Sequence, residues 1–184
     1  MRSALPALLA VGAALGFGLW WTQKHAHDAA SLPWQFVERS VRTHHPDAPT
    51  ITTERLGAWL ADDARPPPLL LDAREPEEYA VSHLPGAVRI DPGASVDALL
   101  TTVLSDSAGR SVVVYCSVGA RSGGVVQRLA RAGLADVYNL EGSIFRWANE
   151  ERPLVRGTEA VREVHPYSVT WGRLLDPALR ADVE

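Results

Sequence analysis

The chain has 184 residues, a formal net charge of −4 and an apolar fraction of 46%, which is normal for a globular protein. This length supports one ordinary domain with extensions, and the acidic balance argues against nucleic acid as a partner, because phosphate binding needs a basic face. The single cysteine, Cys116, excludes an intramolecular disulfide framework. Residues 44–47 read His-His-Pro-Asp, which we interpret as a solvated linker rather than a metal tract, so we expect no metal site.

Residues 4–21 form an uncharged run rich in Ala, Leu and Gly. As a helix they rise about 27 Å, just enough for a bilayer core of about 30 Å, and Trp20 and Trp21 fit an interfacial aromatic belt. A cleaved signal peptide is the alternative, but residues 22–28 offer no good cleavage site. We therefore expect residues 1–22 to be an uncleaved transmembrane anchor. Such a short anchor favours a domain outside the cytoplasm.

Residues 23–49 are expected to be a linker that contains one short helix over residues 31–43. Ser31 can cap this helix, and Pro33 suits its first turn. Its rough apolar side has two interpretations: the helix packs on the domain, or it rests on the membrane surface.

Residues 50–153 alternate short apolar runs with segments of helical periodicity. This alternation predicts a parallel α/β sheet with helices on both faces. The expected strands are residues 50–52, 69–71, 88–90, 112–114 and 137–140. The expected helices are residues 53–62, 75–79, 95–104 and 144–149, together with one that contains residues 125–130 and ends at Gly133.

The stretch at residues 115–122 reads Tyr-Cys-Ser-Val-Gly-Ala-Arg-Ser and connects a buried strand to a helix. Backbone N–H groups converge in such a loop, and the dipole of the following helix favours negative charge there. Cys116 should therefore have a lowered pKa and be partly thiolate at neutral pH. Asp72 also follows a strand, so it should lie near Cys116 at the carboxyl edge of the sheet.

Residues 50–153 resemble a single rhodanese-like (sulfurtransferase) domain. Three stretches carry the resemblance: residues 70–79, the turn at residues 83–87, and residues 115–122 followed by residues 137–142 and Trp147. The family implies a parallel five-stranded sheet with helices on both faces. Ser82 and Ser143 stand where the family usually has glycine, and we expect only local adjustment there.

The resemblance implies a sulfurtransferase that uses no cofactor and passes sulfane sulfur through a persulfide on Cys116. The donor would be a compound such as thiosulfate, and the acceptor a thiol or cyanide. Asp72 and Arg74 are candidate supporting residues. The rest of the loop would bind the substrate: Ser117, Val118, Gly119, Ala120, Arg121 and Ser122. Members that handle thiosulfate well often carry a basic residue inside the loop. The neutral side chains of Ser117, Val118 and Ala120 therefore leave the donor open.

Loop length separates this chemistry from that of cysteine phosphatases, whose loop has five residues between cysteine and arginine. Here four residues separate Cys116 from Arg121, a smaller cradle that suits a single sulfur atom. Arg74 can tune the pocket or form an ion pair with Glu77 or Glu78, and we favour the ion pair. We expect His83 to bond backbone in its turn and Trp147 to lie in the core.

The C-terminal extension, residues 154–184, is more apolar and aromatic than a plain tail needs to be. It can pack back on the domain, which we favour, or bind a protein partner. The second possibility supports an alternative function, a membrane-tethered binding or persulfide-carrier module with little turnover.

Overall fold

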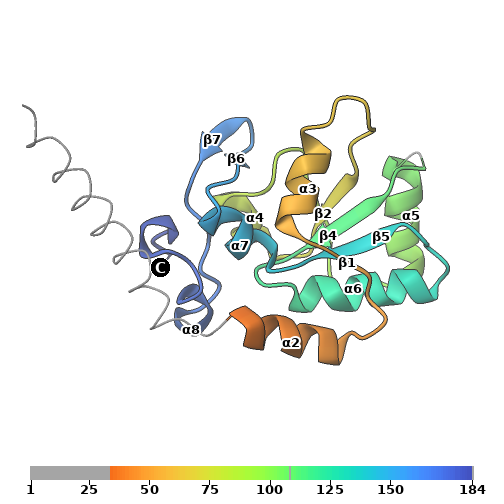
Figure 1. The fold of residues 1–184 in the computed structure, drawn as a ribbon, viewed down its shortest axis with the longest axis horizontal. Coiled ribbons are helices and arrows are strands. Elements are labelled where there is room, and N and C mark those ends of the chain that lie inside the picture. Colours follow the sequence, from red (N-terminus) through yellow and green to blue (C-terminus); the bar gives the residue numbers. More distant parts are fainter. Residues whose placement is uncertain (1–33, 108, 184) are drawn as a thin grey trace, which may run out of the picture.

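The computed structural model describes residues 34–107 and 109–183, and it contains a five-stranded parallel sheet (Figure 1). The hydrogen bonds of the sheet pair Leu70 with Val113 and Val113 with Tyr138 across its three central strands. The predicted α/β fold is therefore confirmed. The strands lie in the order β1 (Thr50–Ile51), β5 (Val137–Leu140), β4 (Val112–Tyr115), β2 (Leu69–Asp72) and β3 (Val88–Arg89).

The expected anchor at residues 1–22, and the Ser31 cap with Pro33, lie outside the described residues. Within residues 34–107 and 109–183, no helix combines the length and the hydrophobicity needed to cross a bilayer.

Helices cover both faces of the sheet because the side chains of the strands alternate between two hydrophobic clusters. On β4, Val113 and Tyr115 belong to one cluster, whereas Val112 and Val114 belong to the other. Cys116, the next residue, continues the second series. The first face is covered by α3 (Thr53–Leu60) and α7 (Ser143–Asn149), and the second by α5 (Val96–Ser107) and α6 (Ala120–Arg131).

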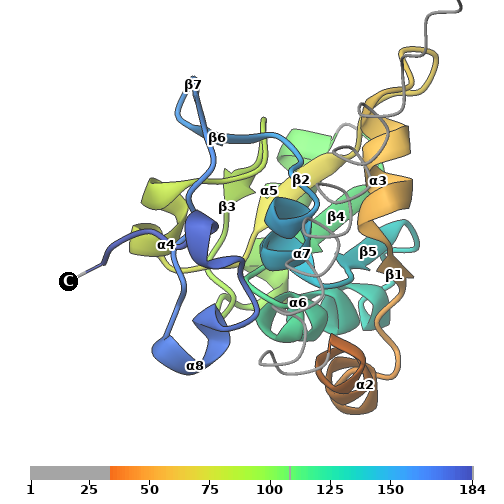
Figure 2. The ribbon, with the colours of Figure 1, turned by 60° about the vertical axis from the view of Figure 1, so that its left-hand side comes forward.

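The helix α2 (Trp34–His44) packs on the domain and runs beside α6 in both ribbon views (Figures 1 and 2). Val37 is buried in the first cluster, and Glu38 forms an ion pair with Arg146 of α7 at 2.6 Å. His45, which belongs to the residues 44–47 that we interpreted as a solvated linker, contacts α6. A Cβ atom added to Gly123 of α6 would lie only 2.8 Å from the His45 ring, so this ring packs directly on the helix backbone.

The C-terminal extension contributes to the same core as the rest of the domain. Its hairpin, β6 (Leu154–Arg156) and β7 (Glu159–Val161), is tied to the turn before β3, because Val155 and His83 exchange backbone hydrogen bonds of 2.8 and 2.9 Å. Beyond it lie α8 (Val169–Gly172) and the 3-10 helix η1 (Pro177–Leu179). The structure therefore shows the packed-back arrangement, with these buried residues: Leu154, Val164, Leu174, Leu175 and Leu179.

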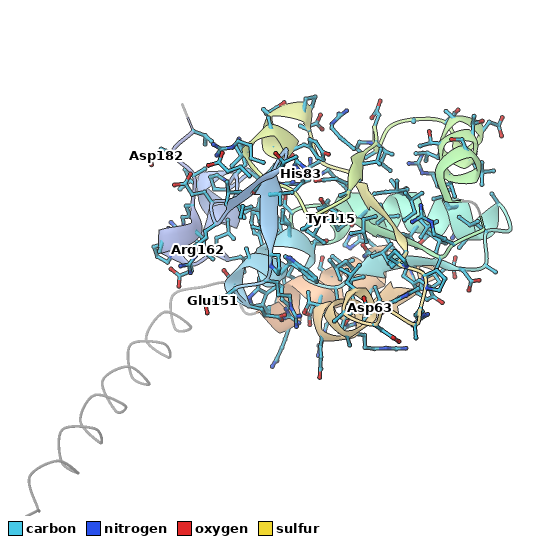
Figure 3. All side chains as sticks on the ribbon, turned by 90° about the horizontal axis from the view of Figure 1, so that it is seen from above. Asp63, His83, Tyr115, Glu151, Arg162 and Asp182 are labelled. Carbon is cyan, nitrogen blue, oxygen red and sulfur yellow. The ribbon has the colours of Figure 1, made fainter. Side chains whose placement is uncertain are left out.

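The outer surface of this extension carries charged side chains. Glu151, Arg162 and Asp182 all lie on that side of the molecule (Figure 3). Arg162 and Glu151 form an exposed ion pair at 3.2 Å, which contributes little to stability because water screens it.

Candidate active site

Cys116 follows β4 directly, and the first turn of α7 holds its backbone. The Cys116 N–H donates to Ser143 Oγ at 3.2 Å, and the Cys116 carbonyl accepts from the Ile144 N–H at 3.2 Å. One residue further on, the Ser117 carbonyl accepts from the Phe145 N–H at 3.1 Å. The side chains of Ile144 and Phe145 are fully buried, so core packing fixes the position of the two N–H groups that bind the loop.

The loop curls back over the sulfur, and the Gly119 N–H donates to Cys116 Sγ at 3.1 Å. Gly119 has φ +104°, a left-handed conformation that residues with a Cβ rarely adopt, and it precedes α6 as the N-cap. Cys116 is 1% exposed, so the loop encloses the sulfur on nearly all sides. Val118 is buried, whereas Ala120 is exposed at the start of α6.

The electrostatic environment of Cys116 favours the thiolate. Burial alone would raise the pKa of the Cys116 thiol. The positive charge of Arg121 and hydrogen bonds from Ser122 and the Gly119 N–H outweigh burial, so the pKa lies below the ordinary value of 9.0. This agrees in direction with the lowered pKa that the sequence predicts. Of the loop N–H groups expected around the sulfur, those of Gly119 and Ser122 reach it.

Arg121 is held by Glu78 of α4 (Pro76–Val81), one of the two carboxylates that we expected as a partner for Arg74. The Arg121 guanidinium donates to both oxygens of Glu78, at 2.6 and 2.8 Å, and to Ser117 Oγ at 2.9 Å. The Ser117 hydroxyl in turn donates to Glu78 Oε1 at 2.8 Å. Glu78 is 1% exposed, and although burial would raise its pKa, these hydrogen bonds lower it. Glu78 therefore joins α4 to the catalytic loop.

Ser122 and Asn139 connect the loop to β5. The Ser122 hydroxyl donates to Asn139 Oδ1 at 2.7 Å, and Asn139 Nδ2 donates to the Gly119 carbonyl at 3.0 Å. The Ser122 hydroxyl also contributes to the lowered pKa of Cys116, but it has a single proton. The Ser122 N–H and the Gly119 N–H are therefore the groups that can donate a hydrogen bond to the sulfur without breaking another hydrogen bond.

Asp72 and Arg74 pair with each other instead of with Glu77 or Glu78. Arg74 donates to the Asp72 carboxylate at 2.6, 2.9 and 3.1 Å, and to the Ser82 carbonyl at 2.6 Å. Both side chains are completely buried. Arg74 lies over the Tyr115 ring, which belongs to the hydrophobic cluster on the face opposite Cys116. The pair therefore holds the turn after β2, which is the structural role that we favoured, although its expected partner was wrong.

His83 and Trp147 occupy structural positions. His83 Nδ1 lies 3.1 Å from the Tyr79 carbonyl, and its ring stacks on Tyr79 with 3.9 Å between the centroids. His83 thus forms a hydrogen bond with the backbone as expected, although this backbone belongs to α4 and not to the turn. His83 is labelled in Figure 3. Trp147 is 2% exposed and donates to the Pro153 carbonyl at 2.9 Å, so it lies in the core as predicted.

Four residues of the site were not assigned there from the sequence: Glu78, Asn139, Ser143 and Tyr167. Glu78 gave a partial signal, because it is an acidic residue just after the strand next to β4. Ser143 was noted only as a departure from glycine. Its φ of +49° is left-handed, which is the conformation that glycine adopts most easily. Tyr167, whose ring lies over the Arg121 guanidinium with 4.9 Å between Cζ and the ring centroid, was visible only as part of the apolar and aromatic C-terminal extension.

Comparison with known proteins agrees with this geometry. The family model for the rhodanese-like domain matches residues 52–150, more than half of the chain, and the chain therefore belongs to the rhodanese-like family. The matched segment contains the sheet strands β2 to β5 and the whole loop around Cys116.

Similar proteins include two bacterial proteins that are longer than this chain. A tRNA uridine(34) hydroxylase from Burkholderia ambifaria is 33% identical over 108 residues, which are 56% of this chain and 38% of that protein. A probable adenylyltransferase/sulfurtransferase MoeZ from Mycobacterium tuberculosis is 33% identical over 106 residues, 56% of this chain and 26% of that protein. The chain thus matches between a quarter and two fifths of the length of these relatives.

Among solved structures, a thiosulfate sulfurtransferase from Pseudomonas aeruginosa superposes with a TM-score of 0.53 at 25% identity, over 77% of this chain and 26% of that one. A protein of unknown function from Rhodopseudomonas palustris, described as a possible tyrosine phosphatase, gives a TM-score of 0.50 at 20% identity, over 66% of this chain and 93% of that one. The second likeness shows the fold alone.

Proposed function

We propose that this chain is a sulfurtransferase that carries sulfane sulfur as a persulfide on Cys116. The observation that carries the proposal is the enclosed sulfur of Cys116, which accepts the Gly119 N–H at 3.1 Å and has a lowered pKa next to Arg121. A thiolate is the nucleophile that sulfur transfer needs, and no separate base is required once it is ionised.

The reaction has two displacement steps. The Cys116 thiolate attacks the outer sulfur of a donor such as thiosulfate, so that a new S–S bond forms and sulfite leaves with the electron pair of the broken bond. An acceptor thiolate, or cyanide, then attacks the outer sulfur of the Cys116 persulfide and restores the thiolate. Loop N–H groups would stabilise the negative sulfur in both states, as an oxyanion hole does for oxygen.

The charge around the loop bears on the choice of donor. The positive charge that lowers the pKa of Cys116 is that of Arg121, but Glu78 already binds both terminal nitrogens of this guanidinium. A second carboxylate, that of Glu75, has its Oε1 3.8 Å from one terminal nitrogen of Arg121. These two carboxylates oppose the binding of a dianion, so we infer that thiosulfate is a poor donor and that the physiological donor carries less charge.

Intact mass spectrometry of the full-length chain tests the sulfurtransferase function. After incubation with thiosulfate or an organic persulfide, the wild type should gain the mass of one sulfur atom, and Cys116→Ser should gain none. An unmodified wild type with every donor, or a modified Cys116→Ser, refutes the proposal.

A persulfide carrier with little turnover is the second candidate function, and the 1% exposure of Cys116 favours it, because an acceptor thiol must reach an enclosed sulfur. Turnover separates the two. A sulfurtransferase forms many equivalents of thiocyanate per Cys116 when cyanide is the acceptor, whereas a carrier stops at one.

We further propose that residues 1–22 anchor the protein in a membrane, on the sequence evidence of the uncharged run at residues 4–21. The full-length chain should stay with the membrane fraction after an alkaline carbonate wash. A chain that lacks residues 1–22 should be released. Release of the full-length chain would contradict the anchor.

A further inference from the structure

The C-terminal extension places an aromatic side chain over the catalytic loop. The Tyr167 ring lies over the guanidinium of Arg121, with 4.9 Å between Arg121 Cζ and the ring centroid. Tyr167 is 50% exposed, so one part of the ring covers Arg121 and another faces solvent. Residue 167 lies beyond the segment that matches the rhodanese-like family, so this contact is a feature that the extension adds to the domain.

The turn that presents Tyr167 is strained and firmly held. Tyr167 has φ +63°, a left-handed conformation that is unfavourable for a bulky side chain. Its N–H donates to His165 Nδ1 at 2.9 Å, and Ser168 caps α8 by accepting the Trp171 N–H at 3.3 Å. On the other side, Val164 is completely buried and pairs with η1. Backbone strain that the surroundings enforce in this way is concentrated at ligand sites.

Tyr167 adds to the cover around the Arg121 charge. Glu78 binds the terminal nitrogens of the guanidinium, and the Tyr167 ring covers one face of the same group. The Arg121 side chain keeps only 23% of its exposure. A small oxyanion therefore finds little of the guanidinium to bind, since Arg binds anions through a free fork of N–H donors.

The same turn offers apolar surface to a different kind of molecule. Val169, two residues after Tyr167, is 85% exposed at the start of α8. An exposed aromatic ring can pack against a carbon body, and aromatic contacts add to the area buried. We propose that Tyr167 is a specificity-determining residue that favours sulfur donors with an organic body over small inorganic anions. This proposal rests on the sulfurtransferase function above.

The corresponding donor class is the persulfide of an organic thiol. In R–S–SH, the Cys116 thiolate attacks the outer sulfur, the bond between the two donor sulfurs breaks, and R–S⁻ leaves with the electron pair. The proton stays on the transferred sulfur, so the products are R–S⁻ and Cys116–S–SH and the charge balances. During this step R would lie on Tyr167, outside the enclosed sulfur.

Organic thiosulfonates test this preference, because benzenethiosulfonate and methanethiosulfonate have the same charge and differ in their carbon body. Cys116 displaces a sulfinate from either one. We would measure kcat/KM for both donors and for thiosulfate on the full-length chain, with cyanide as the acceptor. Wild type should prefer benzenethiosulfonate. Tyr167→Phe should retain this preference within about twofold, because the ring is kept.

Tyr167→Gly should lower the preference for benzenethiosulfonate about two- to fivefold, through KM rather than kcat, in line with the strength of an exposed aromatic contact. It should raise kcat/KM for thiosulfate about two- to fivefold, because the face of Arg121 is uncovered. Glycine also relieves the strain at φ +63°, so the variant should fold. Tyr167→Asn, which tolerates the same conformation, must give the same result.

Phe36→Ala removes a 66% exposed aromatic ring from α2 and is the matched control, with no expected change in donor preference. An unchanged donor ratio in Tyr167→Gly, or an equal fall for all three donors, overturns the role of Tyr167. A wild type that forms no thiocyanate with any donor refutes the proposed function instead, so the two failures are distinguishable.

Discussion

Replacing Glu78 with Gln tests whether the contact between α4 and the catalytic loop stabilises the site. The Glu78 carboxylate accepts four hydrogen bonds: two from Arg121, one from the Ser117 hydroxyl and one from the Glu75 N–H. Glutamine keeps one acceptor oxygen, but its amide nitrogen would face groups that are themselves donors. About half of the bonds are therefore lost, and the charge that balances Arg121 is removed.

The size of the effect follows from this geometry. A hydrogen bond to a charged group contributes about 1.5–3 kcal/mol, so two lost bonds amount to about 3–6 kcal/mol. Arg121 keeps access to water, with 23% of its side chain exposed, which brings the expectation to about 3 kcal/mol. Urea denaturation of the full-length chain measures this loss. For a domain of about 150 residues, the midpoint of thermal unfolding should fall by roughly 6–12 °C.

The pH dependence gives a second check of the same contact. The folded state lowers the pKa of Glu78 below its ordinary value of 4.5, so the stability that this group adds is fully present above that pH. It is lost as the pH falls through the folded pKa, so the difference between wild type and Glu78→Gln should shrink below pH 4.5.

Glu77→Gln is the matched control, because Glu77 is the neighbouring residue of α4 and is exposed. It should change the free energy of unfolding by less than about 0.5 kcal/mol. Equal stability of the two variants would show that Glu78 does not hold the loop.

Three further predictions concern the sulfur, its support and the extension. The rate of Cys116 alkylation by iodoacetamide should fall as the pH drops, with a midpoint below 9.0; a midpoint at or above 9.0 would contradict the role of Arg121 and the loop N–H groups. Ser143→Ala should lower the free energy of unfolding in urea by about 1–3 kcal/mol, because it leaves the buried Cys116 N–H unpaired. Ser143→Gly should lower it less, because glycine relieves the strain at φ +49°. Equal losses would argue against that strain. Leu175→Ala should cost about 2–4 kcal/mol, and a change below about 0.5 kcal/mol would show that the extension does not belong to the core.

The sheet and its helices could be predicted from the sequence because local patterns specify them. Residues 69–71 and 112–114 are short apolar runs, and all residues of β2 and β4, in which they lie, are buried in the middle of the sheet, as expected for strands that are covered on both faces. Gly119, inside the loop, and the helical pattern after it likewise indicated a site around Cys116. Strands, turns and helices of this kind depend on residues that are close together in the sequence, so the sequence alone indicates them.

The charge pairing around the site depended on contacts between distant residues and could not be predicted in the same way. The sequence offers several acidic residues as partners for Arg74 and Arg121. Only the packed structure shows that Arg74 forms an ion pair with Asp72 and Arg121 with Glu78. Tyr167 reaches the loop through the folding of the whole extension, because the burial of Val164 fixes its turn.

The central claim is that Cys116 carries transferred sulfur, and the most direct measurement is the intact mass of the full-length chain after incubation with a sulfane-sulfur donor, before and after cyanide is added. The account predicts one added sulfur atom on wild type, its loss as thiocyanate when cyanide is added, and no addition to Cys116→Ser. A wild-type mass that stays unchanged with thiosulfate, with benzenethiosulfonate and with an organic persulfide would contradict it.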